Sequence, residues 1–185
     1  MKLRRLSAFA AATALVGAAG ALALAPHLPE GATAPGFGGK ATDGKEYSLK
    51  KMVAEGTVFV VFWKERCPHN PRAAPMFNEL YKVYEGKAKL IGVVSASPDG
   101  AKKWSDRFNV TYPLLSDGAK EVIKSYKMKY SIGTMQIAQN GKIIKVFAGY
   151  GKAEMESLNE AMAEAAGTKR KAINLDRAPG LVTWG

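Results

Sequence analysis

Cys67 is the single cysteine of this 185-residue chain, and it comes shortly after residues 58–62, an apolar run typical of a buried strand. A helix is predicted to begin at the cysteine, and the positive end of a helix dipole favours the thiolate, which is the reactive form. Arg66 and Lys64 add positive charge there. A dithiol oxidoreductase would carry a second cysteine three residues later to resolve a mixed disulfide, but that position holds Asn70. The pattern therefore predicts a nucleophilic thiol without an internal partner.

A lone cysteine at the end of a buried strand is often only a small hydrophobic residue, so the flanking residues matter. Pro68 suits an early helical position, because it has no backbone N–H to lose and its φ is already helical. His69 can change the thiolate fraction of the cysteine or take up a proton. We therefore predict Cys67 as the catalytic nucleophile, with Arg66 and His69 as the residues that assist it.

The same residues do not predict a metal centre. Cys67 and His69 are too few ligands for a structural zinc. A copper contact would need a further donor such as Met76, which on a helix stripe is more often a core residue. His27 lies in a predicted linker, where a surface role is the default. We expect neither a metal nor another cofactor.

Alternating strands and helices are expected to position Cys67. Residues 58–62 and 90–94 are short apolar runs rich in β-branched and aromatic side chains, and residues 71–84 between them have apolar residues at helical spacing. Strand, helix and strand in this order imply a right-handed parallel crossover. Further expected elements are helices over 99–108, 118–126 and 153–166, and strands over 134–138 and 142–148 that turn at Asn140 and Gly141.

Several short motifs follow one another between residues 34 and 167. They are Ala34, Pro35, Gly36 and Phe37 with Asp43, Gly44, Lys45 and Leu49; Phe62 and Trp63 with Cys67 and Pro68; residues 94–99 with Trp104 and residues 112–117; and Asn140, Gly141, Lys142 and Ile143. In type and order they resemble the redoxin branch of the thioredoxin fold, which includes alkyl hydroperoxide reductase/thiol-specific antioxidant proteins and periplasmic thioredoxin-like reductases. The resemblance implies a thioredoxin-like α/β fold, with a central mixed sheet flanked by helices.

The chain departs from this family at positions that matter for activity. A peroxiredoxin site would have Thr or Ser in place of Lys64, and an arginine near Ile132 or Gly133. A thioredoxin-type site would have a cis-proline before the strand that starts at Thr134, but residues 114–178 contain no proline. The sequence therefore fits a monothiol or a lapsed enzyme better than either type. The resemblance places on the substrate side Trp63, Pro68, Ile132, Gly133 and Thr134.

The N-terminus predicts export. Lys2, Arg4 and Arg5 precede residues 6–25, which carry no charge and include ten alanines. A hydrophobic helix of this length spans the ~30 Å hydrocarbon core, so a membrane anchor and a cleaved signal peptide are both open. Since the basic flank lies on the N-terminal side, the domain is expected in the periplasm, either free or tethered to the inner membrane.

The chain divides into four segments. Residues 1–25 form the signal peptide or anchor, 26–33 a linker, 34–167 one redoxin domain and 168–185 a tail. The tail is apolar at Leu181, Val182 and Trp184. Folding back onto the domain is slightly preferred over docking on another surface.

The chain has a formal net charge of +11. Nucleic acid is not an expected partner, because the lysines are scattered and no nucleic-acid motif accompanies them. A solvated basic surface and attraction to anionic lipid or an acidic protein remain equal alternatives.

Two functions follow. The first is a monothiol oxidoreductase that carries out thiol–disulfide exchange or peroxide reduction with an external thiol or disulfide protein as its partner. The second is a non-catalytic accessory subunit that binds a membrane protein complex through its basic surface, anchor and tail.

Overall fold

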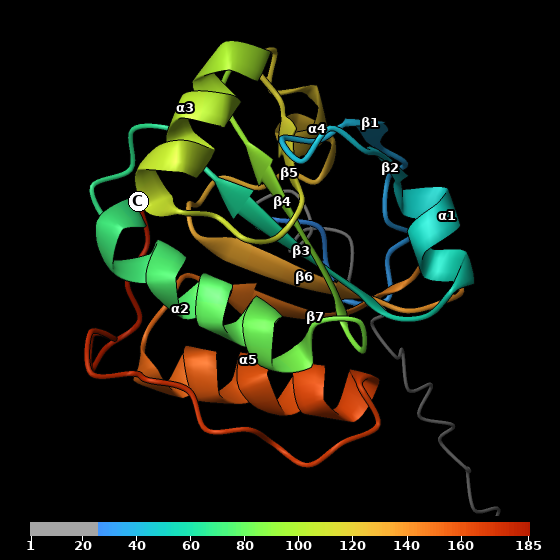
Figure 1. Cartoon of the computed structure of the whole chain (residues 1–185). Helices are drawn as coiled ribbons and strands as arrows, with labels where there is room; N and C mark the ends of the chain where they lie inside the picture. Colours follow the sequence, from blue (N-terminus) through green and yellow to red (C-terminus); the bar gives the residue numbers. More distant parts are fainter. Residues whose placement is uncertain (1–25) are drawn as a thin grey trace, which may run out of the picture.

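A computed structural model describes residues 26–185 as one α/β domain (Figure 1). The hydrophobic helix predicted within residues 1–25 lies outside the described residues. None of the helices within 26–185 is both long and apolar enough to cross a membrane.

The domain is built on a five-stranded sheet with the order β5-β4-β3-β6-β7. Its strands are β3 (Val58–Trp63), β4 (Lys89–Val94), β5 (Leu114–Ser116), β6 (Gly133–Ile137) and β7 (Ile143–Ala148). The β3, β4 and β5 strands are parallel, whereas β6 is antiparallel to β3 and β7 is antiparallel to β6. The central mixed sheet predicted from the sequence is therefore confirmed.

The central strand β3 is buried along its whole length, because helices cover both faces of the sheet. Phe59, Val61 and Trp63 pack into a core with α2 (Asn70–Tyr84), α3 (Pro98–Phe108) and α5 (Lys152–Ala165). The alternating side chains of β3 pack on the opposite face, near α1 (Leu49–Ala54) and α4 (Glu121–Ser125). This burial on both faces explains why the sequence of the strand is a continuous apolar run.

The β3-α2-β4 unit is the parallel crossover that the sequence predicts, with Val58 paired to Lys89 and Trp63 paired to Val94. The carboxyl ends of β3 and β4 therefore lie at one edge of the sheet. The loop that carries Cys67 and the loop between β4 and α3 meet there, where the backbone N–H of Glu65 donates to the Ser95 hydroxyl over 3.2 Å.

The predicted helix over residues 118–126 is shorter in the structure, where α4 covers Glu121–Ser125. The Asp117 carboxylate accepts hydrogen bonds from the backbone of Val122 and Ile123, so the chain turns before the helix begins. The hairpin implied at the N-terminal motif is present as β1 (Gly38–Lys40) paired with β2 (Glu46–Ser48). The periodicity did not predict α1 or β5, which are too short to show a period.

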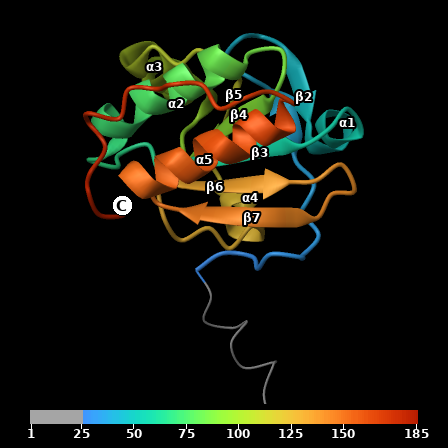
Figure 2. The same ribbon diagram turned by 90° about the horizontal axis from the view of Figure 1, so that it is seen from below.

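The last segment of the chain runs back across α2 and α5 (Figure 2). Asn159 of α5 donates to the carbonyl oxygen of Lys171, and the backbone N–H of Lys171 donates to the Tyr84 hydroxyl of α2. Ile173 and Leu175 pack against the core formed with these helices. Of the two alternatives for the tail, the structure shows the fold-back.

Candidate active site

Cys67 lies between the end of β3 and the start of α2, and its side chain is 7% exposed. The backbone of this segment is turned, since the Cys67 N–H donates to Lys64 O and the Asn70 N–H donates to Cys67 O. These turns keep residues 67–69 out of the helix, which begins at Asn70. The expectation that Pro68 occupies an early helical position is therefore wrong, and Pro71 has that role.

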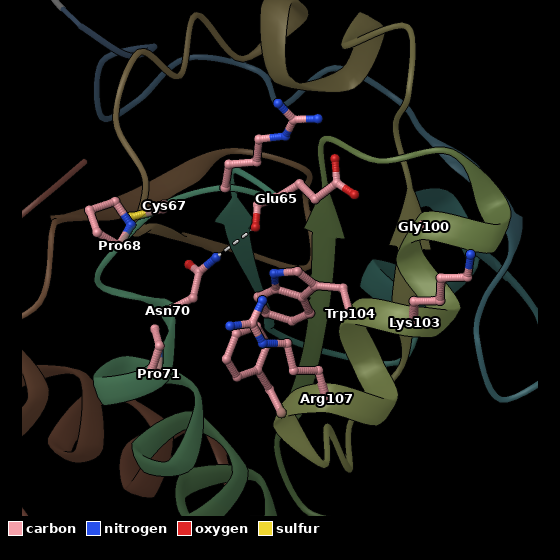
Figure 3. A pocket seen from close by; sticks show the side chains of 11 residues that line it. Glu65, Cys67, Pro68, Asn70, Pro71, Gly100, Lys103, Trp104 and Arg107 are labelled. Carbon is pink, nitrogen blue, oxygen red and sulfur yellow. Dashed lines mark hydrogen bonds between the residues drawn. The ribbon is translucent and has the colours of Figure 1, made fainter.

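Asn70 holds the loop that carries Cys67. Its side-chain amide is 1% exposed and donates to Lys64 O over 3.0 Å and to Glu65 O over 3.2 Å. Figure 3 shows the bond to the Glu65 carbonyl. The residue that stands where a resolving cysteine would lie thus has a structural role, which the sequence did not reveal.

Ser131 fixes the same loop from the other side. Its hydroxyl accepts a hydrogen bond from the Lys64 backbone N–H over 3.0 Å, and the residue is fully buried. The peptide bond between Ser131 and Ile132 is cis. Ser131 lies 64 positions after Cys67 in the sequence, and the family resemblance pointed only to its neighbours at 132–134 and not to Ser131 itself.

Most of the residues expected on the substrate side cannot contact a substrate with their side chains. Trp63 is fully buried and packs on Phe77 and Trp104, with ring centroids 5.2 and 5.1 Å apart. Ile132 and Thr134 are buried in the core and in β6, so a substrate contact at these three positions would involve the backbone. Gly133 is buried too, since a Cβ atom there would lie 2.7 Å from the Met128 sulfur. Pro68 is exposed and lies at the site.

His69 is half-buried and contacts a residue that the sequence did not predict for the site. Its Nδ1 atom lies 3.4 Å from the Tyr150 hydroxyl oxygen, and the two ring centroids are 5.8 Å apart. Burial raises the pKa of Tyr150, the positive charge of Arg72 lowers it, and the negative charge of a Cys67 thiolate raises it. The cysteine, the histidine and the tyrosine therefore form one group at the start of α2.

The C-terminal residues complete the site. Gly185 and Ser131 exchange both backbone hydrogen bonds, and the Lys64 ammonium donates to Gly185 O over 2.9 Å. A Cβ atom added to Gly185 would lie 2.5 Å from the Cys67 sulfur. The end of the described chain therefore lies directly against the thiol. Figure 1 shows the label C of this end beside the start of α2.

Cys67 also borders a cavity of about 490 Å³ between its own loop and α3 (Figure 3). Trp104, Lys103 and Arg107 reach this cavity from α3, and Arg66 and Glu65 reach it from the loop. Arg66, expected beside the thiol, is exposed and forms no salt bridge with any residue in 26–185. Within the same residues no cluster of His, Cys, Asp and Glu could hold a metal ion.

Comparison with known proteins places the chain in a family. The model of the AhpC/TSA family matches residues 31–146, which include the whole Cys67 loop. Thiol-disulfide oxidoreductase ResA from Geobacillus thermodenitrificans is 31% identical over 121 residues, which cover 64% of this chain and 69% of that protein. Peroxiredoxin Q from Suaeda salsa is 27% identical over 100 residues, which cover 54% and 47%.

Solved structures agree on the fold. Peroxidoxin BcpB from Mycobacterium tuberculosis has a TM-score of 0.62 and 20% identity, with 77% of this chain and 99% of that chain covered. The thioredoxin domain of a thiol-disulfide oxidoreductase from Bacteroides vulgatus has a TM-score of 0.62 and 21% identity, with 73% and 99% covered. The fold is thioredoxin-like, and the chain belongs to the AhpC/TSA family of redoxins.

Proposed function

We propose that this protein is an exported thiol oxidoreductase that uses Cys67 in a one-cysteine cycle of thiol–disulfide exchange. The location of Cys67 carries the proposal. It lies at the carboxyl end of the central strand, in a loop held by Asn70 and Ser131, and it borders a cavity. The name of the Geobacillus relative, a thiol-disulfide oxidoreductase, supports this reaction class.

The proposed cycle begins with attack of the Cys67 thiolate on one sulfur of a substrate disulfide. A bond forms between the Cys67 sulfur and that substrate sulfur, and the other substrate sulfur leaves as a thiolate. Because Asn70 stands in place of a resolving cysteine, the second thiol must come from outside. Its thiolate attacks the substrate-derived sulfur, which releases Cys67 as a thiolate and leaves a disulfide between the substrate and the external thiol.

In this cycle Arg66 and His69 assist the cysteine. Arg66 supplies positive charge beside the thiolate, since it borders both cavities that reach Cys67. His69 takes up or returns the proton of a thiol at the site, with its ring oriented by the contact between Nδ1 and the Tyr150 hydroxyl.

Peroxide reduction has weaker support at this site. A hydrogen-bond donor is needed beside the peroxide, but Ile132 and Gly133 are buried apolar residues where the resemblance implies an arginine. Lys64, which replaces the expected Thr or Ser, instead directs its ammonium group to Gly185. Because this chain is also similar to a protein named a peroxiredoxin, peroxide reduction is the alternative reaction to be assayed.

A second candidate function is that of a non-catalytic accessory subunit. The observation that favours it is the low exposure of Cys67, 7%, together with the close approach of Gly185 to the sulfur. Its partner would be a membrane protein complex or anionic lipid, and the basic side chains would make the contact.

The proposed location is the periplasm, either free or tethered to the inner membrane by residues 6–25. The support is the basic N-terminal flank followed by an uncharged run. An alkaline phosphatase fusion after residue 33 tests this, because the enzyme is active only after export. An inactive fusion would contradict the proposed location.

Turnover separates the two functions. The full chain is assayed for exchange between bis(2-hydroxyethyl) disulfide and reduced glutathione, and separately for consumption of hydrogen peroxide in the presence of glutathione. We expect disulfide exchange that Cys67→Ser abolishes, whereas Ser125→Ala, at an exposed position on α4, leaves it unchanged. No Cys67-dependent turnover in either assay, from a folded protein, would contradict the enzyme and favour the accessory subunit.

A further inference from the structure

The C-terminal residues are held as an added strand would be. Tyr150 and Thr183 exchange both of their backbone hydrogen bonds over 2.8 Å, and Ser131 and Gly185 repeat this exchange two residues later. This pattern is how the edge of a sheet or loop binds an extended peptide. Residues 181–185, which we call the capping segment, therefore occupy a place where an extended polypeptide fits.

Small residues beneath the capping segment allow this close contact. Gly149 has a φ of +81°, and a Cβ atom there would lie 2.6 Å from Thr183 O. A Cβ atom at Gly151 would lie 3.1 Å from Leu181 O. The Trp184 ring lies on Tyr130, with centroids 5.4 Å apart, whereas Leu181 points into solvent and is 84% exposed. The segment thus has a fixed path with one side-chain anchor.

Two openings still reach Cys67 beside the capping segment. One is the cavity of about 490 Å³ against α3, and the other is a cavity of about 510 Å³ that Gly185 itself borders. Basic side chains dominate both. The first has Arg66, Lys103 and Arg107 against one acidic residue, Glu65, and the second has Lys64, Arg66 and Lys120 against the same Glu65.

We propose that the capping segment excludes polypeptide disulfides from Cys67, and that the basic side chains around the two remaining openings select small anionic thiols and disulfides as the reactants. The inference rests on the proposed function and adds the substrate class. A peptide needs the backbone groups of Ser131 and Tyr150, which Gly185 and Thr183 already use. A small reagent needs only the cavities, where an anion gains from the local potential.

Reaction of Cys67 with three disulfide reagents tests this in the full chain. The reagents are the dianionic 5,5′-dithiobis(2-nitrobenzoate), the uncharged 2,2′-dithiodipyridine, and a ten-residue uncharged peptide whose cysteine is activated as a thiopyridyl disulfide. We expect the peptide to react slowest. When the protein is shortened to end at Gly180, the rate of the peptide relative to that of dithiodipyridine should rise by on the order of tenfold. An unchanged ratio would overturn the exclusion.

Point variants provide matched controls for the capping segment. Trp184→Ala removes the ring contact with Tyr130 and is expected to raise the peptide rate relative to that of dithiodipyridine, but by less than the truncation at Gly180 does. Leu181→Ala, in the same segment, removes an exposed side chain and should leave it unchanged. An equal effect of both variants would contradict a specific anchor.

A second pair of variants tests the charge selection. Lys103→Gln should lower the rate of the dianionic reagent relative to dithiodipyridine by about threefold. Lys102→Gln changes the neighbouring lysine, which pairs with Asp106 outside the cavity, and should have no effect. Equal behaviour of the two variants would overturn the selection. These rates report single reactions of the thiol and not turnover. A protein with the expected selectivity but without turnover would therefore contradict the proposed function and leave the inference about reagent access intact.

Discussion

Asn70 donates from its side-chain amide to the carbonyl oxygen of Lys64, six residues earlier, and thereby closes the loop in which Cys67 lies. The same amide reaches Glu65 O, so one buried side chain satisfies two backbone acceptors. A dithiol redoxin would use this position for chemistry. Here it stabilises the geometry around a single thiol, which makes Asn70 the natural position for a test.

Asn70→Ala should destabilise the fold by about 1–3 kcal/mol, because the carbonyl groups of Lys64 and Glu65 lose buried donors. Urea unfolding of the full chain measures the difference. Asn70→Asp keeps the size but removes the amide N–H groups, so it should be destabilised as well. A Cys67 alkylation rate that stays unchanged in both variants would contradict the role of Asn70 in holding the loop.

Asn70→Cys should create a disulfide with Cys67 on oxidation. The Asn70 N–H donates to Cys67 O, so the two residues are the ends of a tight turn, with Cα atoms less than about 7 Å apart. A disulfide needs a Cα separation of roughly 4.4–6.8 Å. Thiol titration before and after oxidation measures the result, with Asn70→Ser as the control that adds no thiol. Two free thiols after oxidation of the folded variant would show that the turn holds the two cysteines too far apart to form a disulfide.

Tyr84→Phe should loosen the attachment of the tail. The Tyr84 hydroxyl donates to Asn159 and accepts from the backbone N–H of Lys171, so its loss leaves a buried Asn159 oxygen and a part-buried Lys171 N–H without this partner. The expected cost is about 1–3 kcal/mol. Hydrogen exchange of residues 168–176 should accelerate, whereas Tyr130→Phe, which removes the hydroxyl of a half-buried residue, should leave it unchanged. Unchanged protection in Tyr84→Phe would contradict this attachment.

The stability of the protein should fall as the pH rises above about 10, in part because of Tyr126. Burial raises the pKa of Tyr126 above its ordinary value of 10.0, and its hydroxyl donates to Pro35 O over 2.7 Å. The folded state therefore keeps a proton that the unfolded chain loses. The contribution of Tyr126 is complete below its unfolded pKa and decreases as the pH rises toward the raised folded value.

Tyr126→Phe should flatten this decline by up to about 1.4 kcal/mol per pH unit, the effect of one proton. Urea unfolding at several pH values between neutral and alkaline measures the slope for the variant and the unchanged chain. Parallel slopes would show that Tyr126 titrates alike in the folded and unfolded states.

The sequence by itself determined the elements whose pattern is local. Residues 58–62 and 90–94 had to be buried strands because they are short, apolar and β-branched, and residues 71–84 between them had the spacing of a helix. Asn140 and Gly141 fixed the turn between β6 and β7, since Gly141 takes the positive φ that the turn needs. The position of Cys67 at the end of β3 followed from the same pattern.

Only the tertiary structure decided what surrounds the thiol. Ser131, Tyr150 and Gly185 are far from Cys67 in the sequence, and backbone hydrogen bonds between separate elements bring them to it. A backbone hydrogen bond does not require a particular side chain, so no sequence motif predicted these contacts. The burial of Trp63 and Thr134 was decided in the same way, because burial of a strand end depends on the helices packed over it, which the strand's own residues do not specify.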